Sequence, residues 1–277
     1  MNFHYSYKQL VAALKQVGLR KGDLVLVHSS LFAFGLLKET KGRDLPALVF
    51  KAFREVLGPR GTLVVLSTFE EYARSGKLYD CRLSPVDPLV GKFGQYVANL
   101  PRSYRTYSPL LSLAGVGPLA EEICHSWTAS VCGTDSGWEK LYEHDGKICF
   151  LGVRPYQAFT FLRFVQFRFG VPYIYNKIFT APVYEDGQLV PLQVTCPVRY
   201  LDPAYKISEN LLPFEEYLNS KKLIKSRALG KGTVYAVMSS RRVFDEATKK
   251  LKENLYYFLK QPPGFVPGKI PMDGIRK

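Results

Sequence analysis

Two apolar segments, 24–27 and 62–66, constrain the fold of this chain more than any other feature. Both are rich in leucine and valine and show no polar alternation, which is typical of strands buried on both faces of a parallel sheet. Between them, the stretch 44–57 opens with Asp-Leu-Pro and carries apolar residues at helical spacing until Gly58. A strand, a helix and a strand in this order predict a right-handed βαβ unit whose ligands bind beyond the carboxyl ends of the strands.

The remainder of the chain extends this unit into one α/β domain, predicted to cover residues 1–260. Apolar segments predict further strands at 111–115, 147–153 and 233–237, and helices at 138–143, 160–169 and 240–259. Within the domain we expect a substrate-facing loop region at 70–109, a partly antiparallel insertion at 170–230 and, after the domain, a loosely ordered tail at 261–277.

Composition and missing motifs exclude several classes of protein. Lysine and arginine number 38 against 24 aspartates and glutamates, and the resulting net charge of +14 attracts polyanions. Five cysteines without a Cys-x-x-Cys pair, and four histidines without ligand spacing, argue against disulfides and metal. Walker and Rossmann glycine motifs are absent, and we interpret basic clusters such as 221–225 as solvated faces rather than nucleic-acid contacts. Without a run of about 18 apolar residues, we expect a cytoplasmic protein with no membrane contact.

Polar residues follow both strands at the edge where ligands are expected. His28, Ser29 and Ser30 follow the first strand, and Ser-Thr-Phe at 67–69 follows the second. Hydroxyls and backbone N–H groups at such an edge can bind phosphate or polarise a carbonyl. On this pattern alone, an equally good interpretation is that His28 and Ser29 only satisfy the loop backbone.

The order of several motifs resembles the aminoglycoside 3-N-acetyltransferase family. The match begins with Leu-Val-Leu-Val-His-Ser-Ser-Leu at 24–31 and Gly-Pro-Arg-Gly-Thr-Leu-Val at 58–64. It continues with Tyr-Ser-Pro-Leu-Leu-Ser-Leu-Ala-Gly at 107–115, Cys-Gly-Thr-Asp-Ser at 132–136 and Gly-Val-Pro-Tyr at 170–173. Several motifs in the correct order are more specific than any one of them.

This resemblance implies a three-layer αβα fold with a mostly parallel central sheet, unlike the GNAT acetyltransferases. It also implies direct transfer of an acetyl group from acetyl-CoA to an amine. Ser29, Ser30 and Leu31 would bind the pantetheine arm and the thioester, with backbone N–H groups stabilising the oxyanion and Ser112 beside them. The acceptor cleft would be lined by Thr68, Phe69 and Tyr107.

Three residues, at two places in the chain, depart from the family pattern. Where the family carries Thr-x-x-His-x-x-Glu, this chain has Thr160, Arg163 and Gln166, and Ser108 replaces the histidine of a His-Pro pair. Arginine stays protonated and cannot accept the proton of an attacking amine. The chain is then either catalytically inactive or adapted to an anionic acceptor that Arg163 and Gln166 bind.

The charge balance favours the second alternative, because a site for a polycationic drug should carry carboxylates. We therefore expect an acetyl-CoA-dependent N-acetyltransferase for a nucleotide-linked amino sugar, for example a dTDP-linked one, in surface polysaccharide synthesis. The alternatives are aminoglycoside acetylation, as in antibiotic resistance, and an inactive CoA-binding or basic nucleic-acid-binding protein. The candidate general bases are His28 first, then Asp135 and Glu70, although Asp135 could instead cap the helix that starts near Ser136.

Overall fold

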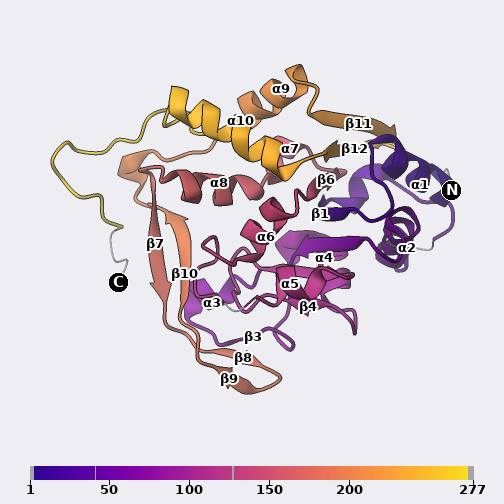
Figure 1. Cartoon of the computed structure of the whole chain (residues 1–277), viewed down its shortest axis with the longest axis horizontal. Helices are drawn as coiled ribbons and strands as arrows, with labels where there is room; N and C mark the ends of the chain where they lie inside the picture. The colour runs from indigo at the N-terminus through magenta and orange to yellow at the C-terminus, as the bar shows by residue number, and fades with distance from the viewer. Residues whose placement is uncertain (1–2, 41, 127, 274–277) are drawn as a thin grey trace.

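The computed structural model describes residues 3–40, 42–126 and 128–273, and its centre is a seven-stranded sheet (Figure 1). The strand order is β11-β12-β6-β1-β2-β5-β4. The bounds are β1 Leu24–Ser29, β2 Thr62–Leu66, β4 Tyr104–Arg105, β5 Leu113–Val116, β6 Lys147–Leu151, β11 Ile224–Leu229 and β12 Gly232–Val237.

Parallel pairing is confined to the middle of this sheet. β1 pairs in parallel with β2, where Val25 faces Leu63, and with β6, where Leu26 faces Ile148. The remaining neighbours are antiparallel. Two of these pairs, β4 with β5 and β11 with β12, join strands that follow each other in the chain without a crossover helix. The predicted α/β class is confirmed, and its parallel part is the three-stranded centre that carries the βαβ unit.

Helices cover both faces of the sheet, which confirms the three-layer architecture. Val25 and Val27 pack with one set of helices, whereas Leu24 and Leu26 pack with the other, since successive side chains of a strand point to opposite faces. The first set is α1 Tyr7–Gln16, α2 Leu45–Leu57 and α4 Gly91–Ala98. The second set is α5 Ala120–Cys124, α6 Gly137–Glu143, α8 Phe161–Phe169, α9 Leu212–Ser220 and α10 Ser240–Glu253. Among the described residues, none of the helices has the length and apolar character needed to cross a membrane.

A hairpin holds the loop that follows β1. Gly230 and Lys231 join β11 to β12, and the N–H of Lys231 donates to the carbonyl of Phe34, 3.1 Å away. Gly230 has a φ of +55°, and a Cβ at this position would lie 2.3 Å from the same carbonyl oxygen. Phe34 ends the short 3-10 helix η1 Leu31–Phe34, so this close approach fixes the chain just past the end of β1.

Two smaller sheets extend away from the central one. β7 Ile174–Phe179 and β10 Val194–Arg199 pair antiparallel, and Figure 1 shows them running from the end of α8 towards the β8–β9 hairpin. β3 Tyr79–Asp80, β8 Val183–Glu185 and β9 Gln188–Val190 form the third sheet. The range 170–230 therefore contains antiparallel strands, and its last strand, β11, joins the central sheet.

Short helices and the tail complete the chain. They are α3 Glu71–Ser75, η2 Pro88–Val90, α7 Pro155–Ala158 and η3 Pro203–Tyr205. Of the predicted tail, residues 274–277 lie outside the described part, and Asp273 accepts hydrogen bonds from the Leu201 N–H at 2.6 Å and from the Tyr175 hydroxyl at 2.5 Å.

Candidate functional site

A large cavity opens at the carboxyl ends of β1 and β2. This rim cavity has a volume of about 1390 Å³. Its wall is formed by His28 to Phe32 after β1, by Leu66 at the end of β2, by Val153 after β6 and by the η2–α4 segment. Phe32 and Leu89 line the rim cavity, and each of them is 82% exposed. Two apolar side chains therefore lie at the mouth of this cavity. The βαβ unit thus places a cavity where the sequence predicted one.

The residues expected to bind the acetyl donor divide into two groups. Ser29, Ser30 and Leu31 all line the rim cavity. The N–H of Ser30 is already bound to the carbonyl of Leu151 at 2.8 Å, so it is not free for an oxyanion. Ser112 is fully buried outside this cavity, where its hydroxyl lies 2.8 Å from that of Ser67 and 2.9 Å from that of Thr106.

The environment of His28 opposes a role as general base. The imidazole is 4% exposed and stacks on Phe150 with a centroid distance of 5.2 Å. Burial lowers its pKa to about 3, because a charged imidazolium is poorly solvated there. The Nε2 atom has no hydrogen-bond partner among the described residues. The alternative interpretation, in which His28 satisfies the loop backbone, therefore finds no support at this nitrogen. Such an imidazole is neutral at physiological pH but too weakly basic to take a proton from an amine.

A second cavity adjoins the first. This side cavity has a volume of about 520 Å³ and shares Gln157, Ala158 and Thr160 with the rim cavity. Thr160 stands at the N-terminus of α8, and Arg163 lies in the first turn of that helix. The other lining residues are Leu111, Tyr156, Phe159, Leu162, the segment 209–212 and Lys260.

Arg163 does line the side cavity, but it already has an anionic partner. Its Nη2 lies 2.9 Å from Oε2 of Glu209, and Nη1 of Arg199 lies 3.1 Å from the same oxygen. Burial lowers the pKa of Arg163 and Glu209 raises it, while arginine remains protonated in either case. The expectation of an arginine free to bind an anion is therefore corrected: Arg163 is paired with Glu209.

The remaining predicted residues lie outside both cavities. Gln166 is fully buried, and neither of its amide atoms has a partner among the described residues. The buried Thr68 and Phe69 follow β2, where the Thr68 carbonyl accepts from Asp87 and the Phe69 N–H donates to Pro109, 2.8 Å each. These side chains are buried, and none of them lines either cavity.

Asp135 and Glu70, the two candidate carboxylates, are also absent from the lining of both cavities. The Asp135 side chain is 65% exposed and pairs with Lys140 at 3.2 Å. It does not cap α6, because the Ser136 hydroxyl accepts the N–H of Glu139 instead. Glu70 stands at the start of α3, where its carbonyl accepts from Ala73 and Arg74. Among the described residues there is no group of three or more His, Cys, Asp or Glu that could hold a metal ion.

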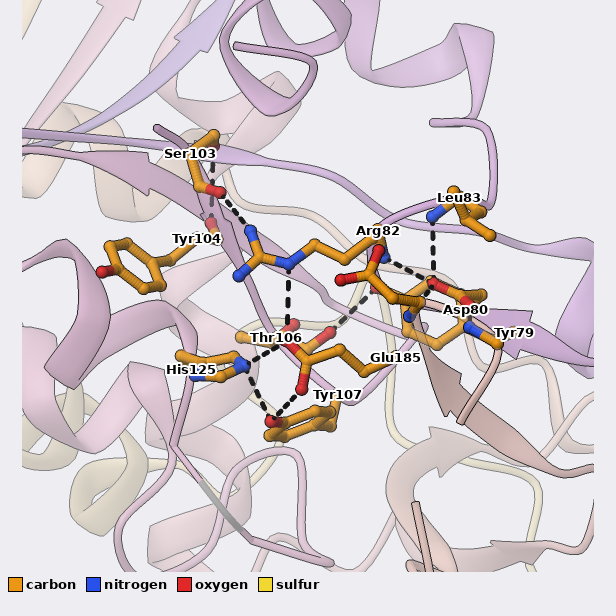
Figure 2. Close-up of polar contacts among 12 residues, drawn as sticks. Tyr79, Asp80, Arg82, Leu83, Ser103, Tyr104, Thr106, Tyr107, His125 and Glu185 are labelled. Carbon is orange, nitrogen blue, oxygen red and sulfur yellow. Dashed lines mark hydrogen bonds and ion pairs between the residues drawn. The ribbon is translucent and has the colours of Figure 1, made fainter. Parts of the chain in front are cut away.

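Tyr107 belongs to a separate polar cluster (Figure 2). Its hydroxyl lies 2.8 Å from Oε2 of Glu185 and 2.7 Å from Nε2 of His125, which is itself 2.8 Å from Glu185. Arg82 pairs with Glu185 at 3.4 Å. Burial alone would raise the pKa of Glu185, but the hydrogen bonds from Tyr107 and His125 outweigh it and hold that pKa below its ordinary value. The cluster ties β8 to the loop before β5, which is a structural role for Tyr107.

Comparison with known proteins identifies the family. The profile of the aminoglycoside 3-N-acetyltransferases matches residues 26–252. The chain belongs to the aminoglycoside 3-N-acetyltransferase family. The predicted class of enzyme, an N-acetyltransferase, is thereby confirmed.

Individual members of this family resemble the chain over most of its length. Aminoglycoside N(3)-acetyltransferase IV of Salmonella sp is 28% identical over 272 residues, which are 95% of this chain and 94% of that protein. The apoenzyme of aminoglycoside acetyltransferase AAC(3)-IVa has a TM-score of 0.75 at 25% identity, covering 95% and 94% of the two chains. A mutant of the same acetyltransferase in complex with gentamicin has a TM-score of 0.75 at 26% identity, covering 95% and 94% of the two chains. The fold is also shared with AAC-IIIb bound to CoASH, at a TM-score of 0.74 and 19% identity, covering 93% and 99% of the two chains.

Two residues that pair around Arg163 were not identified from the sequence: Glu209, which lines the side cavity, and Arg199, which does not. Glu209 and Arg199 belong to no motif, and each stands in a segment of ordinary polar composition. Only the departure at Arg163 carried a signal, since a partly buried arginine needs a carboxylate partner.

Proposed function

We propose that this chain transfers the acetyl group of acetyl-CoA to an amine of an aminoglycoside-type amino sugar. The observation that carries the proposal is the junction of the two cavities at Thr160, beside the carboxyl ends of the central strands. A thioester in the rim cavity and an amine in the side cavity can meet there. Such an arrangement suits direct transfer, which needs the two substrates side by side.

The rim cavity supports the donor part of the proposal. Its volume and its mainly apolar wall suit the pantetheine arm, which carries no charge. Arg43 and Lys92, both exposed, line the same cavity and suit the phosphates of CoA. Phe32 at the mouth offers an aromatic face for the adenine.

The comparisons support an aminoglycoside as the acceptor better than a nucleotide-linked amino sugar. The relatives named above are aminoglycoside acetyltransferases. Glu209 is the one carboxylate among the described residues that line the side cavity, so an amine acceptor has a carboxylate within the site. Our expectation of a nucleotide-linked acceptor rested on the net charge of +14 and on an Arg163 free to bind an anion, and this arginine is paired with Glu209.

One observation keeps the phosphorylated acceptor as a second candidate. A third cavity, of about 400 Å³, shares Lys260 with the side cavity and is also lined by Arg199 and Lys206. We call it the tail cavity. Arg199 also pairs with Glu209, but Lys206 and Lys260 still outnumber the single carboxylate of Asp202 and suit a phosphate on the distal part of an acceptor.

The test is release of the CoA thiol from acetyl-CoA in the presence of different amines. The proposal expects turnover with aminoglycosides such as gentamicin and little with nucleotide-linked amino sugars. The reverse preference establishes the second candidate. Absence of turnover with every amine, together with no rise in Tm at millimolar acetyl-CoA, overturns the proposal.

A further inference from the structure

We infer that Glu209 is the catalytic carboxylate that takes the proton from the attacking amine, an inference that rests on the proposed N-acetyltransferase function. In the family pattern the equivalent proton acceptor is a histidine in the register of Arg163. In this chain Arg163 occupies that position of the motif, and its guanidinium pairs with the carboxylate of Glu209 from a distant segment of the chain.

Elimination among the cavity residues singles out this side chain. Among the described residues that line the rim and side cavities, Glu209 is the only aspartate or glutamate. His28 is the only histidine, and burial lowers its pKa to about 3. Asp135 and Glu70 line neither cavity. A proton acceptor must reach the reacting nitrogen directly or through one water, which leaves Glu209.

Glu209 is held through both its backbone and its side chain. The backbone of Glu209 forms a short antiparallel bridge with Leu259. Two hydrogen bonds flank this bridge, from Asn210 N–H to Phe258 O at 2.9 Å and from Lys260 N–H to Ser208 O at 2.8 Å. Both Arg163 and Arg199 approach Oε2, at 2.9 and 3.1 Å. Among the described residues, both ion pairs of this carboxylate are made at Oε2, which leaves Oε1 to contact an amine.

The chemistry requires only a modest base at this position. The ammonium of the acceptor first loses a proton to solvent, and the free amine attacks the carbonyl carbon of the thioester. The nitrogen becomes strongly acidic as the C–N bond forms, and its second proton passes to Glu209. The C–S bond then breaks, CoA leaves as the thiolate, and Glu209 returns the proton to it. The products are the N-acetylated acceptor and CoA thiol.

The experiment compares Glu209→Gln, Glu209→Ala and the matched control Glu216→Gln, which makes the same chemical change at an exposed glutamate of α9. We expect Glu209→Gln to lower kcat by about 100-fold or more with an unchanged KM for acetyl-CoA, in the range typical of general base catalysis. Glu216→Gln should behave as the wild type. In Glu209→Ala, formate should restore part of the lost kcat, because a small carboxylate can enter the space left in the side cavity.

Two results would overturn the inference. One is a Glu209→Gln enzyme that keeps most of its kcat. The other is a Glu209→Ala enzyme whose lost activity is not restored by formate although acetyl-CoA binding, measured by thermal shift, is intact. A wild type that acetylates no amine would instead count against the proposed function, so the two failures are distinguishable.

Discussion

The guanidinium of Arg163 lies 2.9 Å from the carboxylate of Glu209, and both side chains line the side cavity. The two residues lie far apart in the chain, on α8 and on the segment that pairs with Leu259. The pair accounts for a guanidinium in a partly buried position, because a carboxylate lies against it. Under the role that we propose for Glu209, Arg163 is a positioning residue for that carboxylate.

Replacement of Arg163 by alanine should destabilise the protein and impair catalysis together. A partly buried carboxylate loses one of its two partners, at a cost of about 1 to 3 kcal/mol in the free energy of unfolding. Urea unfolding measures this loss, and steady-state kinetics should show a lower kcat. Arg199→Ala is the control, and we expect a smaller effect because Arg199 is the more exposed of the two arginines. Equal stability of wild type and Arg163→Ala would contradict a stabilising role for the pair.

The donor site can be tested through the phosphates of CoA. The double variant Arg43→Ala, Lys92→Ala should raise the Kd for acetyl-CoA by roughly tenfold, which corresponds to about 1.4 kcal/mol. Titration calorimetry measures the change. Acetyl-pantetheine has no nucleotide, so its binding should be the same in both proteins. A parallel loss of both ligands would show that the two residues support the fold of the cavity and not the phosphates.

The stability of the protein should fall in acid through His28. The pKa of this imidazole is about 3 in the folded protein against 6.5 without burial, so below pH 6.5 the unfolded chain binds a proton that the folded one does not. The contribution of His28 to the free energy of unfolding is fully present above pH 6.5. As the pH falls from 6.5 towards 3, this contribution is lost at up to about 1.4 kcal/mol per pH unit. In His28→Phe, which keeps an aromatic ring on Phe150, unfolding free energies at pH 7 and pH 5 should differ by about 2 kcal/mol less than in the wild type. An NMR titration of His28 between pH 5 and 8 would refute this account by showing a midpoint in that range.

The Tyr107 cluster should control the third sheet. Tyr107→Phe keeps the ring on His125 but removes the hydroxyl that contacts Glu185. We expect faster hydrogen exchange of the β8 amides, corresponding to a loss of about 1 kcal/mol in local stability. Strands β1 and β2 serve as the internal reference and should exchange as in the wild type. Unchanged exchange in β8 would mean that other contacts hold this strand.

Much of the fold and part of the site follow from the sequence by itself. The strands after Asp23 and Gly61, the helix between them and the polar rim at Ser29 and Ser30 depend on local patterns of apolar residues, glycine and proline, which the chain carries in consecutive positions. The rim cavity lies where these patterns predicted, because a βαβ unit leaves only one edge at which both strands end. The antiparallel edges β4 and β11 were beyond such reasoning, because each two-stranded pairing is chosen by contacts in space.

Tertiary structure alone decided what surrounds each candidate side chain. Sequence identified His28, Arg163 and Tyr107 as chemically capable groups, but not the burial that lowers the pKa of His28 or the partners of the other two. Glu209 and Glu185 come from segments without any motif, and only the folded chain brings them within 3 Å of Arg163 and Tyr107. The physical reason is that charge and burial depend on every group nearby in space, whereas the patterns that a sequence displays are limited to neighbours along the chain.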